Sequence, residues 1–293
     1  MTRTLYAFTL IELLVVVTMI VLLLALLVPA MDRAIYQAEM ARCASNIKAM
    51  NGSVIVYAFE FRRHYPYRPR ARNGAASPRP EEIRTVPPAP GLNYDDRITL
   101  RGYVSPNKMM NCPLARKVNL ETEHPETQVF SNFQFWWGWQ YTVGGNYTTT
   151  PDEMRAGMFK VGDAVEWKDS ASTTYRFHLL SGDMDFDNNS AQGYVQSAHP
   201  DSLGLLANRP QEDNPNTPWG NYTNSFWTGN TTGTVDRQFG KDDGSVERVI
   251  GIKHEIGPPG SRITAADGRR LVKVILRANT TTGWGEYTYL PTP

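Results

Sequence analysis

The sequence has few cysteines, no excess of either charge, and none of the short motifs that mark common catalytic sites. Two cysteines are too few for a disulfide-dense scaffold or a four-cysteine zinc site. Lysine plus arginine number 30 and aspartate plus glutamate 29, which argues against a surface built throughout for nucleic acid. Hydrophobic residues make up 41% of the chain, and this share excludes a largely disordered protein.

Motifs for catalysis are also missing. The five histidines form no His-Glu-x-x-His pattern, and the chain has no Gly-x-Ser-x-Gly elbow and no phosphate-binding glycine loop. We therefore predict that the protein is not an enzyme. The 20 prolines, 14 tyrosines and 7 tryptophans favour a loop-rich, aromatic body that contains β-strands.

The N-terminus carries the most informative pattern, a long apolar run. Residues 8–28 contain one charged residue and would form a helix about 31 Å long, close to the roughly 30 Å of a bilayer's hydrocarbon core. Arg3 precedes the run, so the positive-inside tendency predicts a cytoplasmic N-terminus and a translocated body after Pro29.

The one charge in this run, Glu12, needs an explanation. A carboxylate inside an apolar membrane segment costs on the order of 2–3 kcal/mol, and less near the interface. One explanation is that Glu12 reaches back to the lipid headgroups. The other is that it pairs with a cation in the assembled protein.

Residues 7–17, Ala-Phe-Thr-Leu-Ile-Glu-Leu-Leu-Val-Val-Val, resemble the processing and methylation segment of type IV prepilins and type II secretion pseudopilins. In that family a prepilin peptidase cleaves before an aromatic residue, here Phe8, and methylates the new amine. Glu12 would be the fifth residue of the mature chain, and Pro29 lies 21 positions after its first residue, where the family commonly has proline. Ala7 departs from the family pattern, which has glycine at this position.

The resemblance implies both a pathway and a set of partners. Residues 1–7 would be a leader, and the mature chain would cross the bacterial inner membrane once, with its body in the periplasm, before entering a filament. Expected partners are the prepilin peptidase, other pilin or pseudopilin subunits, an inner-membrane assembly platform with its ATPase, and the lipid bilayer, but no nucleic acid. Glu12 would pair with the Phe8 amine of a neighbouring subunit, and such a buried pair fixes register more reliably than it adds stability.

A conventional secretory signal is the rival interpretation of this segment. Residues 28–30, Val-Pro-Ala, could serve as its cleavage site. However, the apolar run exceeds the usual 7–15 residues of such signals, contains Glu12, and has only Arg3 in front of it.

The helix is expected to continue beyond the membrane. Apolar residues from Met31 to Phe61 mostly recur every three or four positions, which predicts an amphipathic helix with a bend at Pro29. From Phe8 to Phe61 it would be about 81 Å long. The predicted organisation is a leader at 1–7, a transmembrane half of the spine helix at 8–29, an amphipathic half at 30–61 and a β-rich body at 62–293.

Further landmarks resemble a bacterial subgroup of pseudopilin-like proteins. They are the segment 43–48 with Tyr57 and Pro66, the pair Cys112-Pro113, and the segment 243–246, Asp-Gly-Ser-Val. Both cysteines would lie on the translocated, oxidising side, so we predict a disulfide between Cys43 and Cys112. The alternative is two buried free thiols that pack as small hydrophobes.

Two stretches of the body could bind ligands. Residues 62–84 contain four prolines, which exclude a helix there, and seven arginines, which could bind a phosphate surface. We interpret the stretch as a solvated loop or a contact with an acidic neighbour rather than a nucleic-acid or lipid site. The aromatic cluster at 130–141 predicts a strand over 133–141. Its rings could form a sheet core, a subunit interface or a carbohydrate platform.

The best metal candidate is the segment 182–189. Asp183, Asp185, Asp187 and Asn189 alternate as do the ligands at the start of a calcium-binding loop. Asn188 and Tyr194 replace the glycine and glutamate of an EF-hand, so Ca²⁺ is a candidate cofactor rather than a firm assignment, and a plain polar turn is the alternative.

The C-terminal third combines a loop with strands. Residues 208–244 are rich in Asn, Thr, Gly and Pro and are predicted to be a loop, whereas 245–252, 270–277 and 284–290 are predicted strands.

The predicted fold class is α+β and pilin-like: a long N-terminal helix packed on an antiparallel sheet. The predicted function is a structural subunit, of a minor or specialised kind, in a type II secretion pseudopilus or type IV pilus-like filament. The alternative is a membrane-tethered periplasmic domain that binds carbohydrate or hydrolyses a substrate.

Overall fold

A computed structural model of the chain describes most of the N-terminal helix and the sheets of the body. The described residues are 9–66, 82–84, 103, 109, 112–114, 128–130, 133–136, 160–168, 173–183, 185–188, 194–197, 199, 225–227, 234–253, 261–279 and 284–292. The chain divides into two compact units, Met1–Ala41 and Arg42–Pro293.

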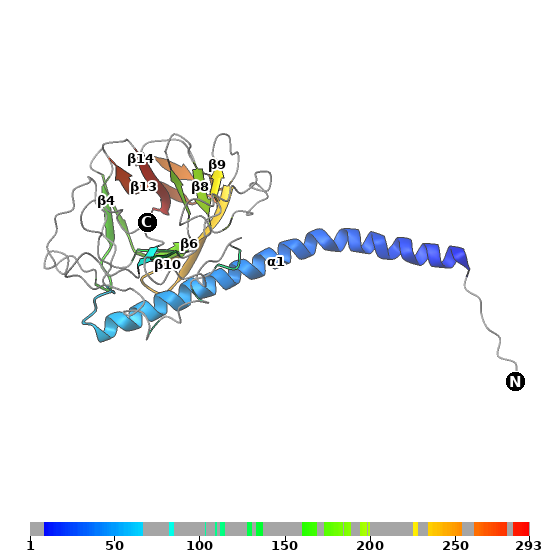
Figure 1. Cartoon of the computed structure of the whole chain (residues 1–293), viewed down its shortest axis with the longest axis horizontal. Coiled ribbons are helices and arrows are strands. Elements are labelled where there is room, and N and C mark those ends of the chain that lie inside the picture. Colours follow the sequence, from blue (N-terminus) through cyan, green and yellow to red (C-terminus); the bar gives the residue numbers. More distant parts are fainter. Residues whose placement is uncertain are drawn as a thin grey trace. The chain divides into compact units, whose positions relative to one another are not determined.

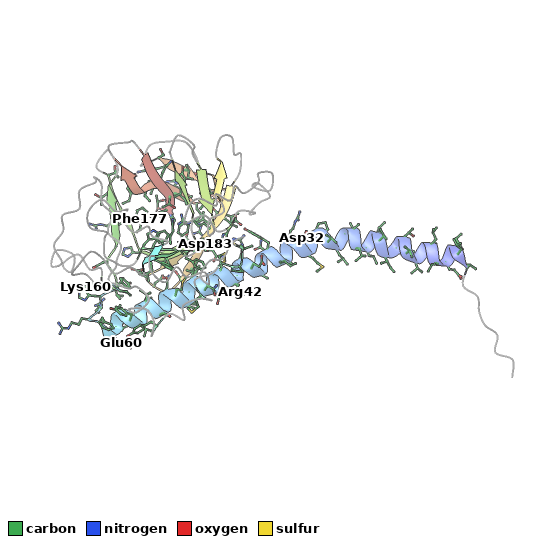
Figure 2. The ribbon with its side chains drawn as sticks, in the orientation of Figure 1. Asp32, Arg42, Glu60, Lys160, Phe177 and Asp183 are labelled. Atoms are coloured by element: carbon green, nitrogen blue, oxygen red, sulfur yellow. A yellow bond between two sulfur atoms is a disulfide. The ribbon has the colours of Figure 1, made fainter. Side chains whose placement is uncertain are left out.

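Helix α1 runs unbroken over Leu10–Glu60, through Pro29, and confirms the predicted long helix (Figure 1). It ends where Arg62 and Arg63 adopt left-handed backbone conformations, with φ of 54° and 67°. Non-glycine residues rarely adopt this region, so neighbouring contacts must hold them there. The Arg63 carbonyl accepts a 2.8 Å hydrogen bond from the Val161 amide, and its guanidinium donates to the Val161 carbonyl. Figure 2 shows Lys160 beside the end of the helix at Glu60.

The first unit contains only the apolar half of α1 among the described residues. Every residue from Thr9 to Ile35 is exposed. By length and composition this helix could cross a membrane. A soluble surface rarely presents so much contiguous apolar area.

In the second unit, α1 contributes one face to a protein core. Its buried side chains recur every three or four residues, as expected for an amphipathic helix: Cys43, Ile47, Met50, Val54 and Ala58. They pack against Phe133, Phe135 and Leu180. Burying one large apolar side chain contributes about 1.5–3 kcal/mol, so this face holds the helix on the body.

A four-stranded antiparallel sheet forms the layer beside the helix, in the order β11-β10-β6-β3. Its strands are β3 (Phe133–Phe135), β6 (Leu179–Asp183), β10 (Thr234–Lys241) and β11 (Val246–Lys253). Side chains alternate across it. Leu180 belongs to the core shared with α1, whereas Leu179 belongs to a second core on the opposite face.

The second core lies between this sheet and a six-stranded antiparallel sheet of order β12-β13-β14-β7-β8-β9. Figure 1 shows β6 and β10 on the side of the body that faces the helix, and β13 and β14 beyond them. The strands are β7 (Asp185–Asn188), β8 (Tyr194–Ser197), β9 (Ser225–Trp227), β12 (Arg262–Thr264), β13 (Arg270–Asn279) and β14 (Trp284–Pro291). Two further antiparallel pairs join β1 (Glu82–Arg84) with β2 (Gln128–Phe130) and β4 (Val165–Lys168) with β5 (Thr174–Phe177). The long helix and antiparallel sheets give an α+β fold.

Sequence patterns located some strands and missed others. The strands predicted at 245–252, 270–277 and 284–290 correspond to β11, β13 and β14. The loop predicted over 208–244 is wrong where it covers β9 and β10. Strand β10 contains the buried polar residues Asp236, Arg237 and Gln238, and polar residues are typical of loops. The turn or loop predicted at 182–189 is wrong as well, because β6 reaches Asp183 and β7 begins at Asp185. Of the strand predicted at 133–141, β3 covers 133–135 and residues 137–141 lie outside the described part.

Gly240 on β10 permits the close approach of helix and sheet. A Cβ added there would overlap the Asn51 amide and lie 2.6 Å from Ile47 Cγ2. We expect Gly240→Ala to lower the free energy of unfolding by about 1–3 kcal/mol through overpacking. Chemical denaturation of the detergent-solubilised chain would measure it.

Gly52 provides a matched control on the same helix. It is exposed, and a Cβ added there meets nothing within 4 Å. Gly52→Ala should raise stability by about 1 kcal/mol from helix propensity alone. Equal effects of the two substitutions would contradict the close helix–sheet contact.

Candidate functional site

The start of α1 shows a local role for Glu12 that sequence reasoning missed. Thr9 and Glu12 form a capping box: the Thr9 amide donates to Glu12 Oε2 at 2.9 Å, and the Glu12 amide donates to Thr9 Oγ1 at 3.3 Å. The Thr9 hydroxyl also donates to the carboxylate at 2.7 Å. The pattern Thr-x-x-Glu was the sequence feature that could have revealed this. Ala7 and Phe8 lie outside the described residues, and the pairing of Glu12 with an amine stays a prediction.

Cys43 and Cys112 are joined by a disulfide in the second unit, with Cα atoms 5.4 Å apart. This separation lies inside the range that a disulfide requires. Both residues are fully buried, and the bond closes a separation of 69 positions. It fastens the first buried helix residue of this unit to the segment that follows residue 111.

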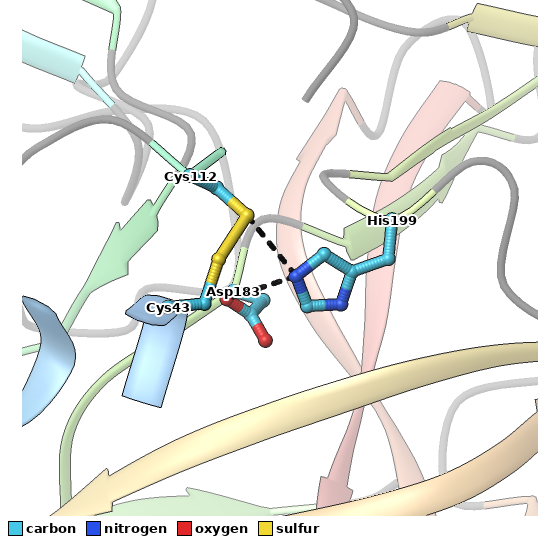
Figure 3. A group of neighbouring side chains, drawn as sticks. All are labelled: Cys43, Cys112, Asp183 and His199. Carbon is cyan, nitrogen blue, oxygen red and sulfur yellow. Dashed lines mark hydrogen bonds and ion pairs between the residues drawn. A yellow bond between two sulfur atoms is a disulfide. The ribbon is translucent and has the colours of Figure 1, made fainter. Parts of the chain in front are cut away.

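A buried histidine lies directly against the disulfide (Figure 3). His199 Nε2 is 3.2 Å from Cys112 Sγ and 3.5 Å from Asp183 Oδ1. On the other side of the ring, Nδ1 is 2.8 Å from the Asp236 backbone carbonyl. A carbonyl only accepts hydrogen bonds, so Nδ1 must carry a proton, and Nε2 is the nitrogen that faces the sulfur and the carboxylate.

Asp183, at the end of β6, is held from a different direction. Its Oδ2 accepts a 2.7 Å hydrogen bond from the backbone amide of Gln238 on β10, and its Oδ1 lies toward His199. The Asp236 that fixes His199 is itself held, because its Oδ2 is 2.6 Å from Arg248 and its Oδ1 accepts from the Gly251 amide at 3.1 Å. The sheet therefore fixes the positions of His199 and Asp183 beside the disulfide.

The predicted calcium ligands are not brought together by the described residues. Asp183 is turned toward His199 and Gln238, and the side chains of Asp185 and Asp187 and all of Asn189 lie outside the described part of the chain. A calcium site stays a prediction. Four other ligand atoms do converge: those of Cys43, Cys112, Asp183 and His199 lie within 4.8 Å of one another. No linear pattern predicts this cluster, since Cys112 and His199 are 87 positions apart.

Next to this cluster, Arg237 is a fully buried cation with several hydrogen-bond partners. Its guanidinium donates to the Asp183 carbonyl at 2.8 Å, to the Tyr289 carbonyl at 3.0 Å, and to the side chains of Gln134 and Thr288. It also stacks 4.6 Å from the Phe239 ring. A buried charge is tolerated only with such partners, so Arg237 is structural and ties the two sheets together.

Hydrogen bonds and burial shift the pKa values of other side chains in the body, among them those of Tyr65, Tyr103 and Asp243. Burial raises the pKa of Tyr65, and the carboxylates of Asp242 and Asp163 raise it further. Glu60 is the last residue of α1, and the hydrogen bond that Tyr103 donates to its carboxylate raises the pKa of the Tyr103 hydroxyl. In the turn between β10 and β11, a hydrogen bond from Ser245 lowers the pKa of Asp243. Gly244 in this turn has φ of 80°, so the Asp-Gly-Ser landmark is a hairpin turn.

The aromatic cluster contributes to the interior where the structure describes it. Phe133, Phe135 and Trp136 are buried, so these three rings cannot stack on a sugar. Phe133 and Phe135 pack against α1, and Trp136 packs in the second core. The other aromatic side chains between 130 and 141 lie outside the described part, and a carbohydrate platform there stays a prediction.

Comparisons with protein-family models, with curated proteins and with solved structures found no match to this chain.

Removing the disulfide should destabilise the body. We expect Cys43→Ser with Cys112→Ser to lower the free energy of unfolding by about 4 kcal/mol in the chain-entropy model for a loop of this length. Denaturation of wild type and double variant would measure the difference. Equal stability of the two chains, with mass spectrometry showing an intact disulfide in the wild type, would contradict the expectation.

Proposed function

We propose that this protein is a structural subunit of a pilin-like filament, either a type II secretion pseudopilus or a type IV pilus-like fibre. The observation that supports this most is the division of one continuous helix between two environments. Residues 13–28 present uncharged, mostly apolar side chains on all sides, and residues 43–58 present a single buried face to a β-rich body. A subunit that is stored in a membrane and then stacked by its helix needs this division.

Membrane storage and filament assembly place the same demand on the apolar half. Before assembly, lipid covers the exposed Leu, Val, Ile and Met side chains of residues 10–28. In a filament, the same side chains pack against the helices of neighbouring subunits. An ordinary anchor would serve only the first state, in which the capping box with Thr9 alone would have to offset the cost of the Glu12 carboxylate in lipid, on the order of 2–3 kcal/mol.

The proposal includes the processing steps and partners that the N-terminal segment implies. A prepilin peptidase cleaves between Ala7 and Phe8 and methylates the new amine. The chain then lies in the bacterial inner membrane with its body in the periplasm. Other subunits, an assembly platform and its ATPase extract it into a filament, where Glu12 pairs with the Phe8 amine of a neighbour.

The mature N-terminus tests processing directly. We expect mass spectrometry of the chain purified from membranes to show a sequence that begins with N-methyl-phenylalanine at Phe8. A chain that begins at Met31 would indicate conventional signal cleavage, and an intact Met1 would indicate an uncleaved anchor. Either result would overturn the processing step and favour a membrane-tethered binding or hydrolytic domain.

The two roles of Glu12 can be separated by substitution. Glu12→Gln keeps an oxygen that accepts the Thr9 hydrogen bonds but removes the charge, whereas Glu12→Ala removes both. If charge pairing drives assembly, both variants should insert into the membrane normally and both should fail to co-assemble with other subunits. Site-specific crosslinking between neighbouring helices would measure assembly.

Thr9→Ala is the matched control for the Glu12 variants. It breaks the capping box, at a typical cost of about 1 kcal/mol to the helix start, but keeps the carboxylate. We expect this variant to assemble. Normal assembly of Glu12→Gln together with failure of Thr9→Ala would show that the capping box matters and the charge does not.

A further inference from the structure

We propose that reduction of the Cys43–Cys112 disulfide creates a buried metal site for Zn²⁺ or a similar thiophilic divalent cation. The ligands would be the two cysteine thiolates, His199 Nε2 and Asp183 Oδ1. The disulfide and the metal would exclude each other, so the chain would carry one or the other according to its redox state. This inference stands independently of the filament role.

The four ligand atoms are already gathered in the oxidised chain. They lie within 4.8 Å of one another, and each of the four residues is at most 1% exposed. They come from α1, from the segment at 112–114, from the end of β6 and from the residue two positions after β8. Breaking the sulfur–sulfur bond allows the sulfurs to separate around a common centre. The histidine and the aspartate need no large movement to reach it.

Each non-sulfur ligand is oriented by a hydrogen bond on its far side. His199 Nδ1 donates to the Asp236 carbonyl at 2.8 Å, which directs Nε2 toward Cys112. Asp183 Oδ2 accepts from the Gln238 amide at 2.7 Å, which leaves Oδ1 on the side of His199. Protein metal sites commonly orient their histidine and carboxylate ligands by such outer contacts.

The donor set selects the class of metal. Two sulfurs, one imidazole nitrogen and one carboxylate oxygen suit tetrahedral Zn²⁺, whereas Ca²⁺ and Mg²⁺ prefer oxygen ligands alone. Two thiolates and one carboxylate carry three negative charges against the two positive charges of the ion. The Arg237 guanidinium, which donates to the Asp183 carbonyl at 2.8 Å, lies nearby to offset the remaining charge.

The redox step balances with a dithiol as reductant. The dithiol gives two electrons and two protons to the Cys43–Cys112 bond, which becomes two thiols while the dithiol becomes a disulfide. Binding of M²⁺ then displaces the two thiol protons to solvent, because the thiolate is the metal ligand. Reoxidation by a disulfide reforms the Cys43–Cys112 bond and releases the ion.

Cobalt provides a spectroscopic probe of this site. The full chain, in detergent and without a histidine tag, is reduced with a phosphine under anaerobic conditions and titrated with Co²⁺. We expect one Co²⁺ per reduced chain, with thiolate-to-cobalt charge-transfer bands in the near ultraviolet and the strong visible bands of tetrahedral cobalt. Zn²⁺ should abolish these bands, and the oxidised chain should show none of them.

Variants identify the two remaining ligands. His199→Gln and Asp183→Asn should each weaken Co²⁺ binding to the reduced chain by at least the 10–100-fold that loss of an outer contact costs. His178→Gln is the matched control, since His178 is exposed and pairs with Asp242 at 2.9 Å, away from the disulfide. It should bind as tightly as the wild type.

Circular dichroism of the reduced chain decides the remaining outcomes. A reduced chain that keeps its fold but shows no cobalt bands overturns the proposal, and so do bands that His199→Gln and Asp183→Asn leave unchanged. If reduction unfolds the body, Zn²⁺ should restore the fold of the wild type but not of His199→Gln. Failure of Zn²⁺ to refold the wild type also overturns the proposal.

Discussion

The whole structure depends on one helix that satisfies two different surroundings with a single unbroken backbone. Over residues 9–35 the side chains of the helix are exposed, and those of residues 13–28 are uncharged and mostly apolar in every direction. Over residues 43–58 it offers one apolar face, which fills a core with Phe133, Phe135 and Leu180. Because a helix satisfies its own backbone hydrogen bonds, the same segment can be stable in lipid, in a filament and against a sheet.

Close contact between the helix and the sheet depends on the composition of strand β10. The strand nearest to Asn51 and Ile47 carries glycine at position 240, and its other residues include Asp236, Arg237 and Gln238, all buried. These polar groups are stable inside because they satisfy one another and their neighbours. Arg237 binds carbonyls of β6 and β14, and the Gln238 amide binds Asp183. The layer between the two cores is therefore joined by directed hydrogen bonds as well as by apolar packing, and these bonds fix the position of His199 and Asp183.

This polar interior explains which parts of the fold the sequence could predict. The helix and strands β11, β13 and β14 are long apolar or periodic segments, whose pattern reports burial directly. Strand β10 was mistaken for a loop because its buried positions are polar, and their partners are distant in the sequence. The His199–Asp183 cluster was invisible for the same reason. The capping box at Thr9 and Glu12 is local, and its pattern Thr-x-x-Glu is readable from the sequence alone.

The disulfide fixes the register between the helix and the sheet at residue 43 by a covalent bond, which apolar packing alone does not do. Cys43 is the first buried helix residue of the second unit, and its bond to Cys112 is covalent. The rest of the face is held by non-covalent contacts, which are apolar packing and the 2.6 Å hydrogen bond from the Ser181 hydroxyl to Asn51 Oδ1. If the protein is a filament subunit, as proposed, the body is carried by this helix during extraction and in the fibre. Apolar contacts can slide under a sustained load, because each is non-directional and individually weak. A covalent bond prevents such a slide at residue 43, so the register between Ile47, Asn51 and Gly240 is kept while the apolar half of the helix exchanges one environment for another.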